Sequence, residues 1–131
     1  MMTKRKAIKM MLGLLFAVLI FHLLIIMQII PYEITWGGRL KSEQEMYVFE
    51  SISIIINLLL GFVLLMQGDY IKRYFKQIVI NIILWFFLVL FILNTIGNML
   101  AKTYFEKSFA VFTLTFAILI VILLKNKTPD N

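Results

Sequence analysis

Four long apolar runs constrain this chain more than any other feature of its sequence. They cover about residues 7–30, 47–66, 77–100 and 108–124, and each approaches the ~20 residues that an α-helix needs to cross the hydrocarbon core of a bilayer. Backbone groups in lipid must be paired within their own segment, so the runs are predicted to be helices. The sequence therefore predicts an all-α integral membrane protein. Its single membrane domain, residues 1–131, is a bundle of four transmembrane helices with an outer loop at residues 31–46.

The composition excludes several other classes of protein. Hydrophobic residues make up 62% of the chain, against about 45–50% in soluble proteins, and a small soluble domain cannot bury so much apolar surface. The chain has no cysteine and one histidine, which excludes disulfides, thiolate chemistry and a multi-histidine metal site. It contains no P-loop, serine-hydrolase or zinc-protease motif. We therefore predict no metal, no organic cofactor and no nucleic-acid partner.

The net charge of +6 comes from basic clusters at the ends of the apolar runs. The clusters are Lys4, Arg5, Lys6 and Lys9 before the first run, Lys72, Arg73 and Lys76 after the second, and Lys125 and Lys127 after the fourth. Lysine and arginine accumulate on the cytoplasmic side of membrane proteins, and four spans place all three clusters on one side. We predict that both termini are cytoplasmic and that residues 31–46 lie outside. The protein is then a multi-pass component of a bacterial cytoplasmic membrane.

Polar side chains inside the runs are costly in lipid, so each needs a partner, a cavity or a function. Those in the outer parts of the first three runs are the candidate ligand-binding residues His22, Glu50, Asn57, Asn94 and Asn98. Glu50, Ser53, Asn57 and Gly61 follow helical spacing along one stripe of the second helix. Asn94 and Asn98 are four residues apart and share a face of the third. If the two faces meet, they form a polar cleft that opens to the outside, with His22 in its wall.

Each of these candidates also has an ordinary structural interpretation. Asparagines join helices through hydrogen bonds worth ~0.6 kcal/mol on average. Glu50 lies near the start of its helix, where a carboxylate gains from the helix dipole, and an interfacial position suits it equally well. His22 stands alone among apolar neighbours, as a neutral histidine bonded to another helix would. The functional alternative for His22 is proton transfer or ligand contact.

The outer loop contains the most distinctive stretch of sequence, Thr-Trp-Gly-Gly-Arg at residues 35–39. Its two glycines allow a tight turn, and tryptophan and arginine are enriched at binding hot spots. We predict that Trp36 and Arg39 fold over the mouth of the cleft, and that Glu50 is partnered by Arg39, His22 or a bound cation. The alternative is an interfacial turn, in which Trp36 lies in the headgroups and Arg39 pairs with a nearby glutamate.

The same region carries a resemblance. It reads Pro31-Tyr32, Thr35-Trp36-Gly37-Gly38-Arg39, Glu45-Met46 and Phe49-Glu50. In this pattern, which covers about a sixth of the chain, the protein resembles a group of small bacterial membrane proteins with four spans. The resemblance implies the four-helix membrane fold and no particular activity.

Two classes of function fit these predictions. In the first, the protein is a non-enzymatic binding or transport-related component that holds a small molecule, a lipid headgroup or a partner protein in the cleft. In the second, it is a membrane enzyme that acts on a lipid, with Glu50 and His22 as acid and base. We favour the first, because catalysis usually requires more titratable groups than one glutamate and one histidine. Either class is compatible with a homo-oligomer or a complex with another membrane protein.

Overall fold

The computed structural model describes residues 3–35, 40–101 and 103–125 of the chain. Within these ranges the elements are α1 (Lys4–Ile26), the short 3-10 helix η1 (Tyr32–Ile34), α2 (Glu43–Gln67), α3 (Gln77–Met99) and α4 (Tyr104–Lys125). Each of the four α-helices is long and apolar enough to cross a membrane. The prediction of an all-α protein with four helices of membrane-spanning length is confirmed.

Three of the helices begin before the predicted apolar runs, because polar residues cap and extend their first turns. The Thr3 hydroxyl accepts a hydrogen bond from the Lys6 backbone N–H at 3.2 Å. The Ser42 hydroxyl accepts one from the Glu45 backbone N–H at 3.2 Å. Such caps satisfy N–H groups that have no partner within the helix. Hydropathy alone places the helix start at the edge of the apolar run and omits these polar turns.

Helices α1 and α2 both end in a left-handed residue that is not glycine. Gln28 has a φ of 62° and Asp69 a φ of 60°. After α1, the backbone N–H of Ile29 returns to the carbonyl of Leu24 at 2.9 Å, as in the helix-ending motif that usually carries glycine at this position. The Gln28 amide also donates to the Tyr47 hydroxyl at 3.1 Å. The end of α1 is thereby fixed to the start of α2.

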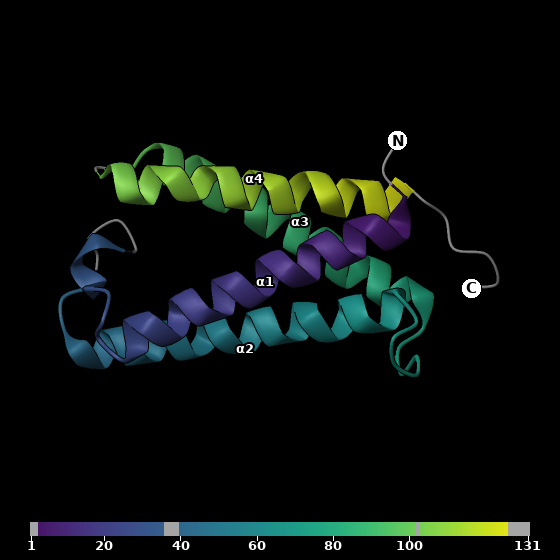
Figure 1. The fold of residues 1–131 in the computed structure, drawn as a ribbon, viewed down its shortest axis with the longest axis horizontal. Helices are drawn as coiled ribbons and strands as arrows, with labels where there is room; N and C mark the ends of the chain where they lie inside the picture. The colour runs from purple at the N-terminus through teal and green to yellow at the C-terminus, as the bar shows by residue number, and fades with distance from the viewer. Residues whose placement is uncertain (1–2, 36–39, 102, 126–131) are drawn as a thin grey trace.

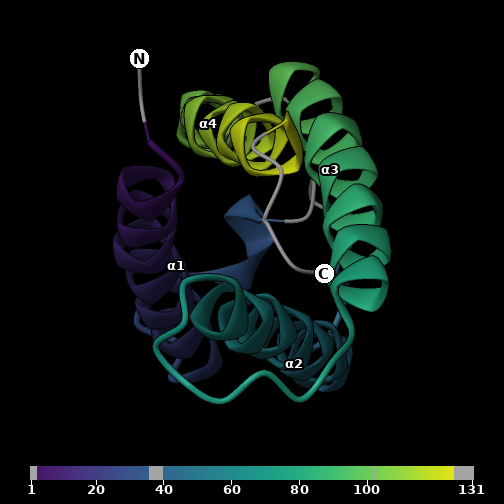
Figure 2. The same ribbon diagram turned by 90° about the vertical axis from the view of Figure 1, so that its right-hand side faces the viewer.

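The four helices form a ring in the order α1, α2, α3, α4, with α4 beside α1 (Figures 1 and 2). Successive helices run in opposite directions. The most extensive contact joins α3 to α4, followed by that between α1 and α2, whereas α2 and α3 touch much less. The bundle therefore consists of two helical hairpins that face each other.

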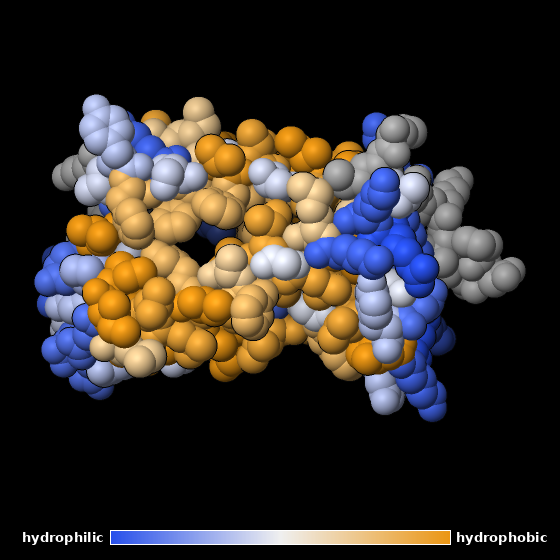
Figure 3. Space-filling model, viewed as in Figure 1, coloured by the Kyte–Doolittle hydropathy of each residue, from blue (hydrophilic) through white to orange (hydrophobic). Residues whose placement is uncertain are grey.

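The hydrophobic core is concentrated at one end of this ring. It comprises Ala7, Ile8, Met11 and Leu15 of α1, Leu60, Val63, Leu64 and Met66 of α2, Ile80, Leu84, Phe87, Leu88 and Phe91 of α3, and Phe116, Ala117, Leu119, Ile120 and Leu123 of α4. We call this end, where α1 begins and α4 ends, the basic end, because hydrophilic side chains including Lys4, Lys72 and Lys125 surround it (Figure 3). The opposite end, which we call the loop end, has a smaller cluster of Ile25, Leu40 and Met46.

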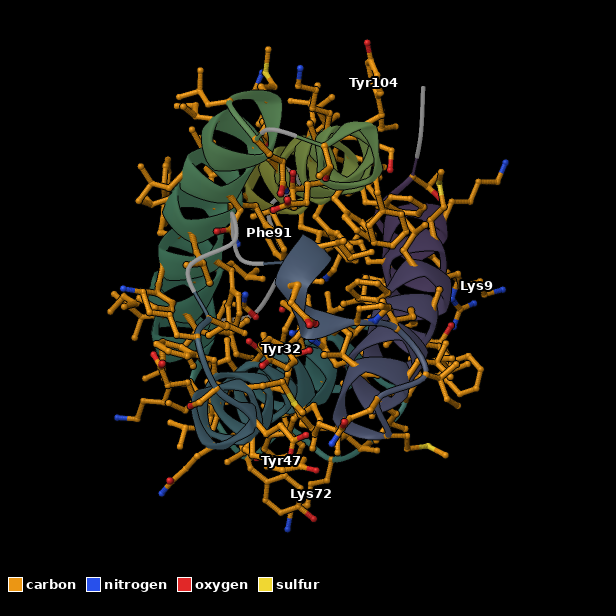
Figure 4. The ribbon with its side chains drawn as sticks, turned by 90° about the vertical axis from the view of Figure 1, so that its left-hand side faces the viewer. Lys9, Tyr32, Tyr47, Lys72, Phe91 and Tyr104 are labelled. Atoms are coloured by element: carbon orange, nitrogen blue, oxygen red, sulfur yellow. The ribbon has the colours of Figure 1, made fainter. Side chains whose placement is uncertain are left out.

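At the loop end the chain folds back over the bundle. In the end-on view of Figure 4, η1 and Tyr32 lie across the middle of the ring of helices. Thr35, which follows η1, is buried, and its hydroxyl donates to the Tyr32 carbonyl at 2.7 Å. Leu40 is buried against the start of α2. Trp36 and Arg39 lie outside the described residues, so their place over the mouth stays a prediction.

Candidate functional site

The most distinctive polar contact in the bundle joins α1 to α2 near the loop end. The Nδ1 atom of His22 lies 2.9 Å from Oε1 of Glu50. The Glu50 side chain has no exposed surface, and that of His22 is 14% exposed. A carboxylate removed from solvent requires a hydrogen-bonding partner, because burying an unpaired charge is very costly. Of the partners predicted for Glu50 (Arg39, His22 or a bound cation), His22 is the one found beside it, and Arg39 lies outside the described residues.

Helical spacing explains why these two side chains meet. Glu50 and Gly61 lie on one stripe of α2, three turns apart. The stripe faces α1 at both points, because a β-carbon built on Gly61 would lie 3.2 Å from the side chain of Leu15. Glycine at residue 61 leaves room for the close approach of the Leu15 side chain. This close approach fixes the register in which His22 lies opposite Glu50.

The second ring nitrogen of His22, Nε2, is the atom of the pair that can form a hydrogen bond with another molecule. When the Glu50 carboxylate accepts the hydrogen bond, Nδ1 carries the hydrogen, and Nε2 of the neutral ring is then an acceptor. Among the described residues, no hydrogen-bonding partner for Nε2 is present. The carboxylate therefore orients the imidazole and leaves one nitrogen for another molecule.

The structure buries only some of the predicted cleft residues of α2 and α3. Asn57 is half-buried, and its amide donates to the backbone carbonyl of Ser53 at 2.7 Å. Asn98 is half-buried as well, but Asn94 is exposed. The prediction that Asn94 faces the interior is wrong. Its neighbour Thr95 takes that position, because Thr95 continues the buried face set by the core residues of α3.

Thr95 and Thr113 join α3 to α4 on the inner side of the bundle. The Thr113 hydroxyl accepts from the Thr95 hydroxyl at 2.8 Å and donates to the Phe109 carbonyl of its own helix at 3.1 Å. The Thr95 hydroxyl also lies 2.8 Å from the Phe91 carbonyl, so its one hydrogen is shared between two acceptors. Hydroxyl bonds of this kind satisfy the side chains locally and add modest stability between membrane helices. We assign them a structural role.

A second buried carboxylate, Glu106, is absent from the predicted site residues. It lies in the first turn of α4 with 6% of its surface exposed. The Thr103 hydroxyl accepts from the Glu106 backbone N–H at 3.1 Å and lies 3.1 Å from its carboxylate. The Thr-x-x-Glu spacing of a helix-capping box is the signal that indicates this local arrangement. Hydropathy does not reveal it, because Glu106 precedes the fourth apolar run and so belongs to the predicted connection.

A row of phenylalanines runs along α4, and its first two members contact α1. Phe105, Phe109, Phe112 and Phe116 recur at helical spacing. Phe21 of α1 crosses to this row, with ring centroids 4.7 Å from Phe109 and 6.0 Å from Phe105. We call Phe21, Phe105 and Phe109 the aromatic bridge. The Phe21 ring lies edge-on to the His22 ring, with centroids 5.8 Å apart, so the bridge places an apolar wall beside the histidine.

The surface between α1 and α4 is hollowed. In Figure 1 the two helices are close at the basic end and diverge toward the loop end. Figure 3 shows a hollow between them, on the loop-end side of the middle of the molecule. Its rim is hydrophobic, and hydrophilic surface lies at its bottom. The interior is thus reachable through the apolar side wall of the bundle.

A separate polar network closes the basic end. The Gln77 amide donates to the side chains of Gln67, at 3.0 Å, and Asn81, at 2.9 Å. The Arg73 guanidinium donates to the Gln77 side-chain oxygen. The network joins the end of α2, the following connection and the start of α3. It lies at the opposite end of the bundle from the His22–Glu50 pair.

Comparison with protein family models, with curated proteins and with solved structures finds no match to this chain. Among the described residues, no group of three or more histidine or acidic side chains is arranged to hold a metal ion. Inferences about function therefore rest on the geometry of the bundle, above all on His22 and Glu50.

Proposed function

We propose that the protein is a non-enzymatic, multi-pass membrane protein that binds a small molecule or a lipid headgroup at His22 and Glu50. The observation that carries the proposal is the 2.9 Å contact between a fully buried carboxylate and a partly exposed imidazole. A single polar pair in an apolar, largely enclosed site is typical of small-molecule binding sites. In a lipid-spanning segment, an ionisable side chain is a functional candidate by default.

The two residues have different roles in this proposal. Glu50 holds the histidine ring in one orientation and one tautomer. His22 presents Nε2 to the ligand, while Asn57 and Asn98, both half-buried, supply further polar surface in the same half of the bundle. Trp36 and Arg39, which lie outside the described residues, belong to this proposal only as predicted contacts from the outer loop. A transport-related role would use the same site, since a transported molecule must first bind.

Native mass spectrometry of the protein, extracted together with its surrounding lipid, tests this function. We expect the wild-type protein to retain a non-protein mass that His22→Asn loses. The asparagine amide lies where Nδ1 was and can still donate to Glu50, but nothing replaces Nε2. Asn94→Leu is the matched control, because Asn94 is a polar residue of the same half but exposed. Equal retention by wild type and His22→Asn would overturn the proposal.

The proposed orientation places the loop end outside and the basic end in the bacterial cytoplasm. It is supported by the gathering of lysine and arginine at the basic end. The chain lacks cysteine, so single cysteines can be labelled without background. An impermeant thiol reagent should label Ser42→Cys in intact cells, and should label Lys72→Cys only after the membrane is opened. The reverse pattern contradicts this orientation.

A second candidate function is catalysis on a lipid, and the orientation of His22 favours it specifically. A carboxylate bonded to Nδ1, with Nε2 directed to the substrate, is the arrangement in which histidine acts as a general base. The mass retained by the protein separates the two candidates. A binding protein returns the same molecule after incubation, whereas an enzyme converts it, and His22→Asn abolishes the conversion.

A further inference from the structure

The hollow between α1 and α4 bears on which molecules can reach His22. It lies in the apolar side wall of the bundle, in the half that contains the His22–Glu50 pair, and its rim is hydrophobic while its floor is hydrophilic. In a membrane this wall faces acyl chains, because all four helices are of spanning length. A molecule that enters here comes from the lipid.

The aromatic bridge gives such a molecule a surface for its apolar part. Phe21 lies against Phe109 with ring centroids 4.7 Å apart. Phe112, one turn further along α4, is 39% exposed and lies 6.2 Å from Phe109. Toward the basic end the row joins the core, where Phe116 stacks on Phe91 at 4.8 Å. The row thus offers aromatic contact area that suits a hydrocarbon chain.

His22 determines which polar headgroup the entering molecule can carry. In the neutral tautomer that donates Nδ1–H to Glu50, Nε2 accepts a hydrogen bond, and the matching headgroup is then a donor. Hydroxyl and ammonium groups both donate. A charged ammonium, however, would have to cross a hydrophobic rim, where charge is costly. An uncharged hydroxyl crosses at lower cost.

We propose that an amphiphile with one hydrocarbon chain and a hydroxyl headgroup enters from the bilayer between α1 and α4 and donates its hydroxyl hydrogen to His22 Nε2. This inference rests on the binding function proposed above and adds the class of ligand and its route. The chain of the amphiphile lies along the aromatic bridge, and its headgroup is next to Glu50.

The probe that tests this is a long-chain alcohol with a photoactivatable diazirine in its chain, added to the full-length protein in phosphatidylcholine vesicles. We expect crosslinks in peptides that contain Phe21 and Phe109, with at least a fivefold reduction by an excess of the unmodified alcohol. The corresponding long-chain phosphate should compete at least fivefold less well than the alcohol. If the phosphate competes better than the alcohol, the assignment of a hydroxyl headgroup is wrong. Crosslinks concentrated on lipid-facing residues such as Phe16 and Trp85 overturn the site.

The route is tested by narrowing the hollow. Val18 is half-buried one turn before Phe21 on α1, so Val18→Trp should reduce crosslinking at least fivefold. Phe16 lies on the opposite side of α1 and is 66% exposed, and Phe16→Trp, which adds a larger side chain on that outer face, should leave crosslinking unchanged. If Val18→Trp does not fold, competition by the alcohol in the wild-type protein still decides the class of ligand. Crosslinking lost in His22→Asn but kept in a folded Val18→Trp overturns the route alone. Crosslinking unchanged in both overturns the proposed function as well.

Discussion

Replacement of Glu50 by glutamine should leave a folded, membrane-inserted protein that has lost most of its ligand binding. Glutamine has the size of glutamate, and its side-chain oxygen can still accept the hydrogen bond from His22 at the observed 2.9 Å. The negative charge that orients and polarises the ring is removed. Hydrogen bonds to charged groups are worth about 1.5–3 kcal/mol, so we expect roughly tenfold weaker binding or more.

Retention of the co-purifying mass and crosslinking by the photoactivatable alcohol are the measurements for this substitution. Glu43→Gln removes the same charge from the exposed first turn of the same helix, and Ser51→Ala alters an exposed residue next to Glu50. Both should bind as the wild type does. Wild-type binding by Glu50→Gln would reduce Glu50 to a structural partner of His22 and end its assignment to the site.

The largest effect on stability should follow from Phe87→Ala. Phe87 has no exposed surface, and its ring lies 6.1 Å from that of Phe91 in the core. Truncation leaves a cavity that the neighbouring helices cannot fill. We expect the free energy of unfolding to fall by about 2–4 kcal/mol. Most of this decrease comes from lost packing contacts, because lipid is as apolar as the core.

Phe86 provides the matched control for that substitution. It is the adjacent residue, but 57% of its surface is exposed, where acyl chains replace the missing ring. Phe86→Ala should therefore change the free energy of unfolding by much less, as measured by titration with a denaturing detergent in mixed micelles. Equal losses from the two substitutions would mean that α3 does not present Phe87 to the core.

The helices could be predicted from the sequence because the length of an apolar run directly reflects the thickness of a bilayer. The stripe through Glu50 and Gly61 could also be predicted, since a polar and a small residue stand out in an apolar helix. The inward face of α3 could not. That helix is apolar nearly all round, so its hydropathy does not distinguish the side facing protein from the side facing lipid. The error at Asn94, adjacent to the buried Thr95, has this origin.

The contact between His22 and Glu50 could be proposed from the sequence only as one of several pairings. The two residues are separated by a loop whose length leaves the register of α1 against α2 undetermined. The register depends on packing details such as the approach of Leu15 to Gly61. The aromatic bridge could not be predicted for a related reason. Phenylalanines in a membrane helix are as compatible with lipid as with an internal wall, and only the neighbouring helix distinguishes the two.

The division of the bundle into two hairpins has a consequence for how the chain enters the membrane. The His22–Glu50 contact lies within the α1–α2 hairpin, and the Thr95–Thr113 contact lies within the α3–α4 hairpin. Each of these polar side chains thus finds its partner on the helix that is synthesised next to its own. Polar groups in lipid are costly without a partner, so insertion of successive helices as pairs shields them during biogenesis. Docking of one hairpin against the other then adds the apolar packing of the core at the basic end and the hydrogen bond between Gln67 and Gln77.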